Sequence, residues 1–411
     1  MKILKITFLT QYFPPEPGPP PARYSALSKQ LFQMGYKVTV VTAFPNYPTG
    51  IIPSNYKGKF FLREQSDGLR VFRTWIYAVP NKGIFKRLLS QLTFAISSLF
   101  TYPFIGQQDI VYAEYPPLFS AFSGYIMSKL CRAKYILNVA DLWLDFAVEL
   151  NMVKKQSVFF NIAKIVERFC YRKAVKITTP TQGFLNNLIE VEKIRPDKLY
   201  LLTNAVDTDF FAPCPEPETY NRVLSRYGFS KKFVLFYGGT HGPAQGLHAL
   251  IEAARILKEK PIIFLFVGDG SEKKSLMILA QKYRLENVIF KDIIPKDQMP
   301  DFIRAADACV VSLSSFPMFQ GAVPSKTLEY MACAKPVIAS AKGELAELIK
   351  KAKCGVVAEP ENPVALANEI ERVVSTKIEA RILMGLNGRA YIEQHYSRDK
   401  YIGEFIKIIN A

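Results

Sequence analysis

The fold is decided by the stretch KILKITFLTQYFPPEPGPPPARYSALSKQLFQMGYKVTVVT, Lys2–Thr42. Apolar runs of strand length stand at its two ends, and Ala22–Met34 between them predicts a helix that Gly35 closes. The segment Gln11–Pro21 is too rich in proline for a regular element and is predicted to be a loop. Strand, helix and strand in this order form a βαβ unit, the opening of a parallel, doubly wound sheet. Such folds bind ligands at the carboxyl ends of their strands.

The same alternation begins again in the second half of the chain. FVLFYG (Phe233–Gly238) and IIFLFV (Ile262–Val267) predict buried strands, with a helical pattern at Leu247–Lys258 between them. The sequence before Lys232 has several prolines and little pattern, which places a domain boundary near residue 205. The chain has 411 residues, of which 49% are hydrophobic, so two domains can each bury a core.

We therefore predict an α/β protein made of two doubly wound, Rossmann-like domains that face each other across a cleft. The first domain comprises residues 1–205 and the second comprises residues 206–394. A C-terminal helix at about 395–411 is predicted to pack back on the first domain.

The charge of the chain predicts an anionic partner for its first half. The net charge is +17, and residues 1–200 contain 26 Lys and Arg against 12 Asp and Glu, a net of +14. Membrane surfaces, nucleic acids and phosphorylated lipids all carry the opposite charge. No helix-turn-helix, zinc finger, RRM or arginine-rich arm is visible, so we expect no nucleic-acid partner.

The cysteine and histidine residues favour a reducing compartment and no metal centre. Six cysteines are scattered without a C-x-x-C pair, and there are only three histidines. The first ten residues read as a buried strand with no small-residue cleavage site behind it, so we expect a cytoplasmic protein.

Residues 84–106 leave three interpretations open. Lys86 and Arg87 precede the uncharged run Leu88–Ile105, which contains Ser, Thr, Gln and Pro. A helix buried under the sheet is favoured over an interfacial helix lying on a membrane, and a true span is the least favoured.

The segment PSKTLEYMACAKPVIAS, Pro324–Ser340, suggests an anion site. Ser325 is a plausible N-cap for a short helix, with Lys326 on its first turn and Glu329 one turn further. Backbone donors and a cation suit a phosphate, and a carboxylate suits vicinal hydroxyls, so the set suits a sugar nucleotide. On chemistry alone, an ordinary helix with a solvated Lys and Glu explains the segment as well as an anion site does.

Other segments at predicted strand ends carry candidate chemistry. The glycine-rich turn Gly238–Gly246 lies between a strand and a helix, where backbone can approach an anion closely, although a flexible turn is the alternative. Gly268–Ser271 is equally consistent with a plain helix cap. Asp141 and Glu114 each end a predicted strand and are candidates to orient or deprotonate an acceptor hydroxyl, or simply to cap a helix.

Together these segments resemble the family 4 glycosyltransferases of the GT-B type, and among them the bacterial subset that builds capsule or O-antigen polysaccharides. The resemblance covers nearly the whole chain. It rests on QYFPPEPGPPPAR (Gln11–Arg23), TAFPNYPTG (Thr42–Gly50), VADLWLDFAVELN (Val139–Asn151), PTQGF (Pro180–Phe184), NAVDTDFF (Asn204–Phe211), YGGTHGPAQGL (Tyr237–Leu247), FVGDGSEK (Phe266–Lys273) and PSKTLEYMACAKPVIAS.

The resemblance implies a retaining enzyme that needs no metal or other cofactor. A nucleotide-sugar donor, expected to be a UDP-sugar, would bind the second domain. The acceptor, a polyprenyl-diphosphate-linked saccharide, would bind the first, with the enzyme peripheral at the inner face of the cytoplasmic membrane. Carried over by position, the donor-binding residues are Gly18, Gly239, Thr240, His241, Gln245, Asp269, Ser325, Lys326 and Glu329. The catalytic candidates are Asp141, Lys326 and Glu114.

Three positions depart from the family pattern. Many members have an Arg and a Lys where this chain has Thr240 and Gln245, and a first glutamate where it has Gly321. Lys326 is therefore the predicted replacement for the lost diphosphate cations.

Two rival functions remain open. One is a sugar-nucleotide epimerase of the same architecture, and the other is a catalytically inactive, membrane-associated adaptor.

Overall fold

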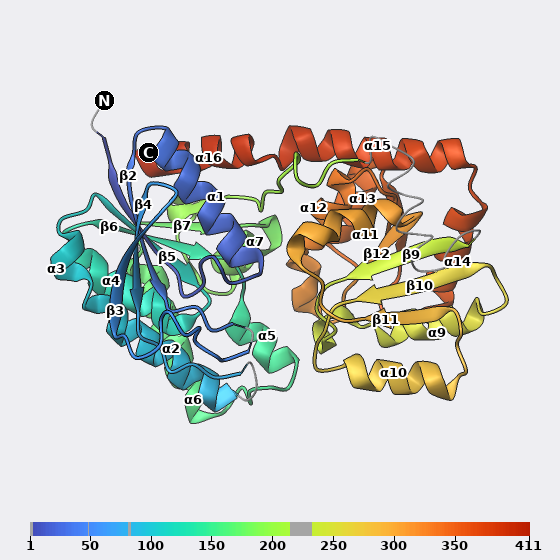
Figure 1. The fold of residues 1–411 in the computed structure, drawn as a ribbon, viewed down its shortest axis with the longest axis horizontal. Coiled ribbons are helices and arrows are strands. Elements are labelled where there is room, and N and C mark those ends of the chain that lie inside the picture. The colour runs from blue at the N-terminus through green and yellow to red at the C-terminus, as the bar shows by residue number, and fades with distance from the viewer. Residues whose placement is uncertain (1–2, 48, 81–83, 214–231) are drawn as a thin grey trace. The chain divides into compact units, whose positions relative to one another are not determined.

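The chain is described by a computed structural model that covers residues 3–47, 49–80, 84–213 and 232–411 (Figure 1). It separates into two compact units, Met1–Thr203 together with Ile402–Ala411, and Asn204–Tyr401. The helix α16 (Arg398–Asn410) contributes to both units. The proline-containing stretch at 214–231, which the sequence analysis left without regular structure, lies outside the described residues.

The first unit is built on an eight-stranded sheet in the order β3-β4-β2-β1-β5-β6-β7-β8. All neighbours are parallel except β3 and β4, and Phe8 at the centre pairs with Val40 on one side and Tyr112 on the other. The strands are β1 (Lys5–Leu9), β2 (Lys37–Ala43), β3 (Phe61–Ser66), β4 (Leu69–Thr74), β5 (Ile110–Tyr115), β6 (Lys134–Val139), β7 (Lys176–Thr179) and β8 (Leu199–Leu201).

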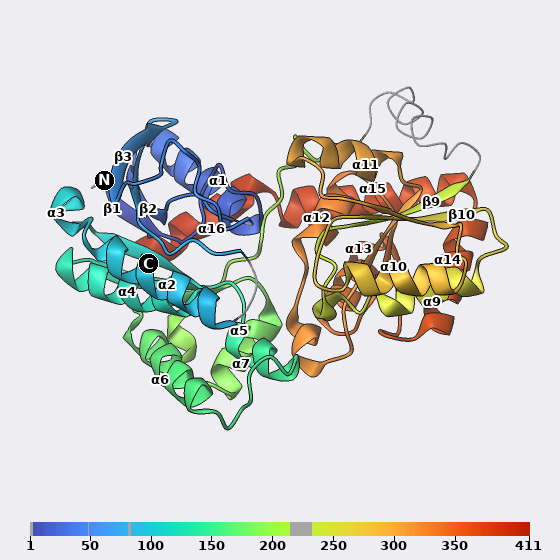
Figure 2. The same cartoon turned by 60° about the horizontal axis from the view of Figure 1, so that its bottom comes forward.

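Helices cover both faces of this sheet, as Figure 2 shows. Adjacent residues of a strand point to opposite faces, and in β5 Tyr112 contacts Phe405 of α16 whereas Ala113 lies against Gly124 of α4. The helices are α1 (Pro19–Gln33), α2 (Ile84–Leu99), α3 (Tyr102–Ile105), α4 (Leu118–Leu130), α5 (Trp143–Glu149), α6 (Val158–Lys173), α7 (Gln182–Glu190) and the 3-10 turn η1 (Pro196–Lys198).

The second unit has a six-stranded, fully parallel sheet in the order β11-β10-β9-β12-β13-β14. Its strands are β9 (Phe233–Gly238), β10 (Ile262–Val267), β11 (Val288–Lys291), β12 (Ala308–Ser312), β13 (Val337–Ser340) and β14 (Gly355–Ala358). Its helices are α9 (His248–Ile256), α10 (Lys273–Lys282), α11 (Met299–Ala305), α12 (Ser325–Ala332), α13 (Glu344–Ala352), α14 (Pro363–Ser375) and α15 (Ile378–His395), with 3-10 turns η2 (Pro243–Gln245), η3 (Lys296–Gln298) and η4 (Pro317–Gly321). Both sheets are doubly wound, as the sequence predicted.

Two helix starts differ from the sequence prediction, and proline explains both. Helix α1 begins at Pro19, inside the segment predicted to be a loop, because proline suits the first turn of a helix, where its missing N–H would have no partner. Ser325 is the first residue of α12 and not its N-cap; Pro324 holds the N-cap position and supplies no side-chain hydrogen bond.

The uncharged run Leu88–Ile105 makes up most of α2 and all of α3. Helix α2 buries Phe94 and exposes Phe85 and Ile96, so it is half core and half surface. Among the described residues, no helix is both long and apolar enough to cross a membrane. A true span was the least favoured of the three interpretations, and the described residues do not support it.

Candidate functional site

The two glycine-rich turns of the second unit pack backbone against backbone at the carboxyl ends of β9 and β10. The Gly239 N–H donates to the Val267 carbonyl at 2.8 Å. A Cβ added at Gly268 would lie 2.0 Å from the Gly239 carbonyl oxygen, and one at Gly270 would lie 2.2 Å from that of His241. Glycine is needed at 268 and 270 because the other turn occupies the space of a side chain.

Lys326 lies directly on the first of these turns. A Cβ at Gly239 would be only 2.9 Å from the Lys326 Nζ. The same nitrogen donates to the Tyr237 hydroxyl at 2.7 Å and lies 3.9 Å from the centroid of that ring. The helix is tied to the turn a second time, since Tyr330 accepts a hydrogen bond from the Gly238 N–H at 2.8 Å. The predicted residues Gly239 and Lys326 are thus brought to one place, and Ser325 precedes Lys326 in the first turn of α12.

Burial makes Lys326 an unusual cation. It lowers the pKa of the ammonium from its ordinary value to about 7, and the nearby Glu329 carboxylate opposes the change only partly. Near pH 7 the amine is therefore present in both its protonated and neutral forms. A dianionic ligand at this place would favour the protonated form and raise the pKa.

Glu329 lies one turn further along α12 and is half-buried. Burial raises the pKa of its carboxyl, and Lys296 and Lys326 oppose that rise. Lys296 begins the 3-10 turn η3 after β11, is exposed, and was missed by the sequence analysis. A cation shortly after a strand of a parallel sheet was the signal that could have identified it.

The remaining predicted residues of the turn occupy different environments. Thr240 is exposed, and its carbonyl oxygen accepts a hydrogen bond from the Tyr237 hydroxyl at 2.6 Å. Gln245 is half-buried in η2. Asp269 is exposed and its side chain accepts a hydrogen bond from the Gly270 N–H, so it shapes the turn and does not cap α10.

His241 lies beneath the turn rather than on its surface. Its side chain is fully buried against the rings of Tyr237, Phe266 and Phe290. Burial lowers the pKa of the imidazole to about 4, and Lys273 and Lys326 act in the same direction, so the ring is neutral at pH 7. Its contacts are those of a packing residue.

In the first unit, Glu114 is fully engaged by neighbouring side chains. It is 1% exposed; one carboxylate oxygen pairs with Arg23 of α1, and the other accepts a hydrogen bond from the Thr10 hydroxyl at 2.6 Å. Gly18, at a φ of +123°, is the N-cap of the same helix. Glu114 therefore fastens the helix that Gly18 begins, and a catalytic role for it stays a prediction.

Asp141 follows β6 and precedes α5. Burial raises the pKa of its carboxyl to about 7, although a hydrogen bond from the Leu142 backbone N–H acts to lower it. A carboxyl with this pKa can accept a proton at neutral pH and release it again, which is what a general base requires.

One group of acids in the first unit has the spacing of a metal site. Oxygens of Asp145, Glu167 and Glu192 lie within 4.8 Å of one another. The Lys164 ammonium lies among them, 2.7 Å from a carboxylate oxygen of each glutamate. The charge that a metal ion would supply is therefore already supplied by a lysine.

Two protein-family models match this chain. The model described as "Glycosyl transferase 4-like domain" matches residues 21–205, and the model described as "Glycosyl transferases group 1" matches residues 225–390. Together they span most of the chain. The Escherichia coli K12 protein WcaI, named as a colanic acid biosynthesis glycosyl transferase, is 25% identical over 391 residues, 93% of each chain.

Solved structures share the whole fold. A sucrose-phosphate synthase from Thermosynechococcus elongatus superposes with a TM-score of 0.79 at 18% identity, covering 99% of this chain and 98% of its own. The Anabaena protein Alr3699/HepE, solved in complex with UDP-glucose, has a TM-score of 0.75 at 17% identity over 99% of each chain.

The two doubly wound units give the chain the GT-B fold of the glycosyltransferase structures that it resembles. Within that class, the chain belongs to glycosyltransferase family 4 and is an enzyme of sugar transfer.

Proposed function

We propose that this chain is a retaining glycosyltransferase that moves a sugar from a UDP-sugar to a polyprenyl-diphosphate-linked saccharide during the synthesis of capsule or O-antigen. The observation that carries the donor half is the contact between Lys326 and Gly239, one helical turn from Glu329. A cation against an open backbone turn suits a diphosphate, and the carboxylate suits the ribose hydroxyls. Two relatives support the proposal: WcaI is named for colanic acid biosynthesis, and HepE was solved in complex with UDP-glucose.

The chemistry needs charge stabilisation at the leaving group. Negative charge develops on the diphosphate as the sugar–oxygen bond breaks, while the sugar becomes oxocarbenium-like. Protonated Lys326 and the backbone N–H groups of the turn would stabilise that charge. Asp141 would accept the proton of the attacking hydroxyl, and front-side attack would retain the anomeric configuration. No step requires a metal ion.

A donor screen tests this function. Nucleotide-sugars are incubated with an undecaprenyl-diphosphate-linked sugar, with EDTA in a parallel series, and the anomeric configuration of the product is read by NMR. We expect transfer with retention, unaffected by EDTA. Conversion of the nucleotide-sugar without acceptor would support the epimerase, and tight binding without turnover would support the inactive adaptor.

The pKa of Asp141 predicts the pH profile of turnover. With donor saturating, so that its diphosphate keeps Lys326 protonated, kcat should follow the ionised Asp141. Since burial raises the pKa of this carboxyl to about 7, kcat should fall about tenfold per unit below pH 7 and level off above it. Asp141→Asn should be slower and lack this acidic limb. An unchanged limb in that variant would remove Asp141 from the mechanism.

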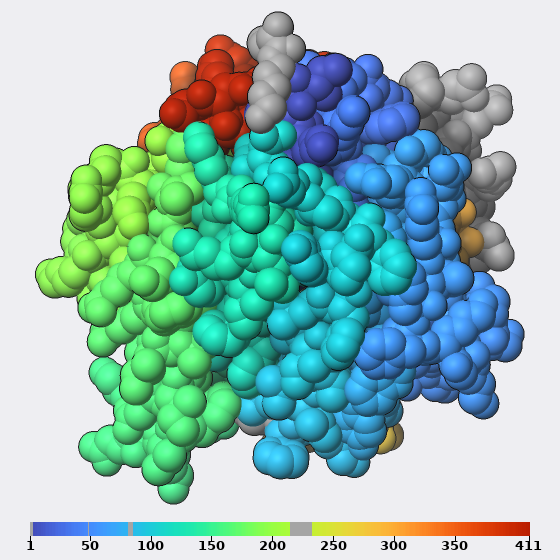
Figure 3. Space-filling model, turned by 90° about the vertical axis from the view of Figure 1, so that its left-hand side faces the viewer, coloured from blue at the N-terminus to red at the C-terminus, as the bar shows by residue number. Residues whose placement is uncertain are grey.

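A membrane surface is the proposed location of the enzyme, and the outer face of three adjacent helices supports it. Helices α2, α4 and α6 pack side by side, and Figure 3 looks onto this face of the first unit. They expose large apolar side chains at helical spacing: Phe85, Leu89, Leu92 and Ile96 on α2, Phe122 and Leu130 on α4, and Val158, Ile162 and Ile165 on α6.

The charge of this face has one sign. Helices α2 and α4 contain no Asp or Glu, and the single acid of α6, Glu167, is buried. Exposed cations include Lys86, Arg168 and Arg172. Ile165, Phe169 and three cations of α6 line a groove of about 630 Å³. Apolar side chains within a cationic surface suit insertion between anionic headgroups.

Vesicle flotation tests the membrane proposal. We expect the protein to float at low salt with vesicles rich in phosphatidylglycerol and to stay behind with phosphatidylcholine alone, because each surface cation adds about 1 kcal/mol near anionic lipid. The double variant Ile162→Glu/Ile165→Glu should abolish flotation. Ile382→Glu, an equally exposed isoleucine on α15, is the matched control. Equal flotation of both variants would contradict the assignment of this face.

A further inference from the structure

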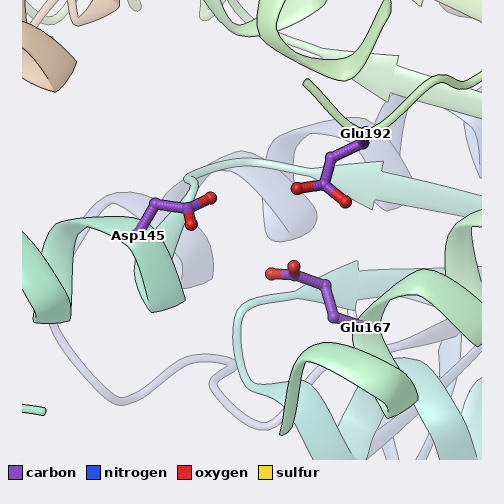
Figure 4. A group of neighbouring side chains, drawn as sticks. All are labelled: Asp145, Glu167 and Glu192. Atoms are coloured by element: carbon purple, nitrogen blue, oxygen red, sulfur yellow. The ribbon is translucent and has the colours of Figure 1, made fainter. Parts of the chain in front are cut away.

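A buried ionic cluster in the first unit is centred on Lys164. Its ammonium lies 3.1 Å from Asp145, 2.7 Å from Glu167 and 2.7 Å from Glu192. Figure 4 shows the three carboxylates pointing toward one another from three different segments. Arg168 pairs with the second oxygen of Glu192 at 2.9 Å, and the Tyr115 hydroxyl donates to Glu167.

The cluster joins four parts of the unit. Lys164 and Glu167 belong to α6, Glu192 follows α7, and Tyr115 ends β5. The fourth part is α5, through Asp145 in its first turn. Because every pair of the cluster except Lys164–Glu167 crosses between elements, the cluster fixes where these elements lie relative to one another more than it adds stability.

Helix α5 is the element that depends on this contact. It has seven residues and starts two positions after Asp141, the proposed base. Its N-cap residue, Leu142, supplies no side-chain hydrogen bond. The first turn is held instead by Lys164, which donates to both carboxylate oxygens of Asp145, at 3.1 and 3.2 Å.

The balance of charge makes the cluster sensitive to the loss of its lysine. Three carboxylates face one ammonium and one guanidinium. Burial would lower the pKa of Lys164, yet the surrounding carboxylates hold it above its ordinary value. Burial raises the pKa of Glu167. Without the ammonium, buried like charges would repel one another, and Asp145, the half-exposed member, is the one free to move outward.

We propose that Lys164 is a positioning residue for glycosyl transfer, which through Asp145 holds α5 and thereby the segment of Asp141 in its working orientation. The inference rests on the proposed role of Asp141 as the base. It assigns Lys164 no contact with substrate.

The test combines turnover with a local reporter. The chain has two tryptophans, and Trp143 is the first residue of α5, so its fluorescence in a Trp75→Phe background reports on that helix. In this background, Lys164→Ala is expected to shift the Trp143 emission and lower kcat about 10- to 100-fold, with the donor KM unchanged. Lys164→Arg, which keeps the charge, should restore most of kcat.

A cation should substitute for the missing ammonium. Lys164→Ala leaves three carboxylates within coordinating distance of one another, so millimolar Ca²⁺ should reverse both the emission shift and the loss of kcat. The parent protein, and Lys164→Ala/Glu167→Ala, should not respond. If Lys164→Ala does not fold, Asp145→Asn is used in its place. It breaks the same ion pair between Lys164 and Asp145 while reducing the excess of negative charge in the cluster. Lys37→Ala, an exposed lysine of β2 outside the cluster, is the matched control and should leave both the emission and kcat unchanged.

The outcomes separate this inference from the proposed function. An emission shift or a lower melting temperature with kcat and its pH profile unchanged would show a structural role alone and overturn the inference. Unchanged emission and kcat in both Lys164→Ala and Asp145→Asn would do the same. Full turnover of Asp141→Asn would instead remove the base on which the proposed mechanism depends.

Discussion

Lys326→Ala is expected to lower kcat about 10²- to 10³-fold while the protein remains folded, the range seen when one preorganised donor to a developing charge is removed. The size of the effect follows from the sequence, because Thr240 and Gln245 stand where many relatives carry cations. Lys326 must then supply much of the positive charge at the diphosphate. Purified variants assayed at saturating donor, with melting temperatures measured in parallel, check this.

The melting temperature separates lost chemistry from lost structure. Burying a partly protonated amine costs stability, so Lys326→Ala should melt at the same temperature as the parent or higher. Lys351→Ala, an exposed lysine on α13, is the matched control and should be fully active. Turnover of Lys326→Ala within about twofold of the parent would contradict the assignment.

Glu329→Ala is expected to raise the donor KM about 10- to 100-fold with a smaller change in kcat. A hydrogen bond to a charged group contributes about 1.5–3 kcal/mol, and a ribose contact far from the breaking bond is made equally in the ground and transition states. Initial rates over a wide range of donor concentration measure the two constants separately.

A donor analogue can show that Glu329 acts on the ribose. The 2′-deoxy form of the UDP-sugar should be a poor substrate for the parent protein and no worse than the natural donor for Glu329→Ala, since each change removes the same contact. Equal losses for the analogue in parent and variant would place the carboxylate elsewhere. Glu329→Gln, which keeps the shape and loses the charge, should fall between the two.

Strong local patterns allowed much of the fold to be predicted. The predicted strands at Phe233–Gly238 and Ile262–Val267 match β9 and β10 residue for residue, because buried parallel strands are continuous apolar runs. Elements without such a run were missed. Helix α5 is short and was not predicted. Helix α13 and strand β14, which follow the segment Pro324–Ser340, were not predicted either.

The candidate site was predictable where one segment carries the chemistry. The approach of Lys326 to Gly239 joins residues that the sequence analysis had named separately, since both lie at the carboxyl edge of one parallel sheet. Lys296 and Lys164 were not predicted, because their roles depend on partners distant in sequence. The division of donor and acceptor between residues 206–394 and 1–205 stays a prediction.

The central claim is that the ammonium of Lys326 meets the donor diphosphate, and proton uptake on binding measures it most directly. Calorimetric titration with UDP at pH 7, in buffers of different ionisation enthalpy, gives the number of protons taken up. The pKa of Lys326 is about 7 before binding and should rise in the complex, so the parent should take up about half a proton per UDP and bind more weakly as the pH rises. Lys326→Ala should lose this uptake and most of the affinity. Equal uptake in parent and variant, or equal affinity, would contradict the account.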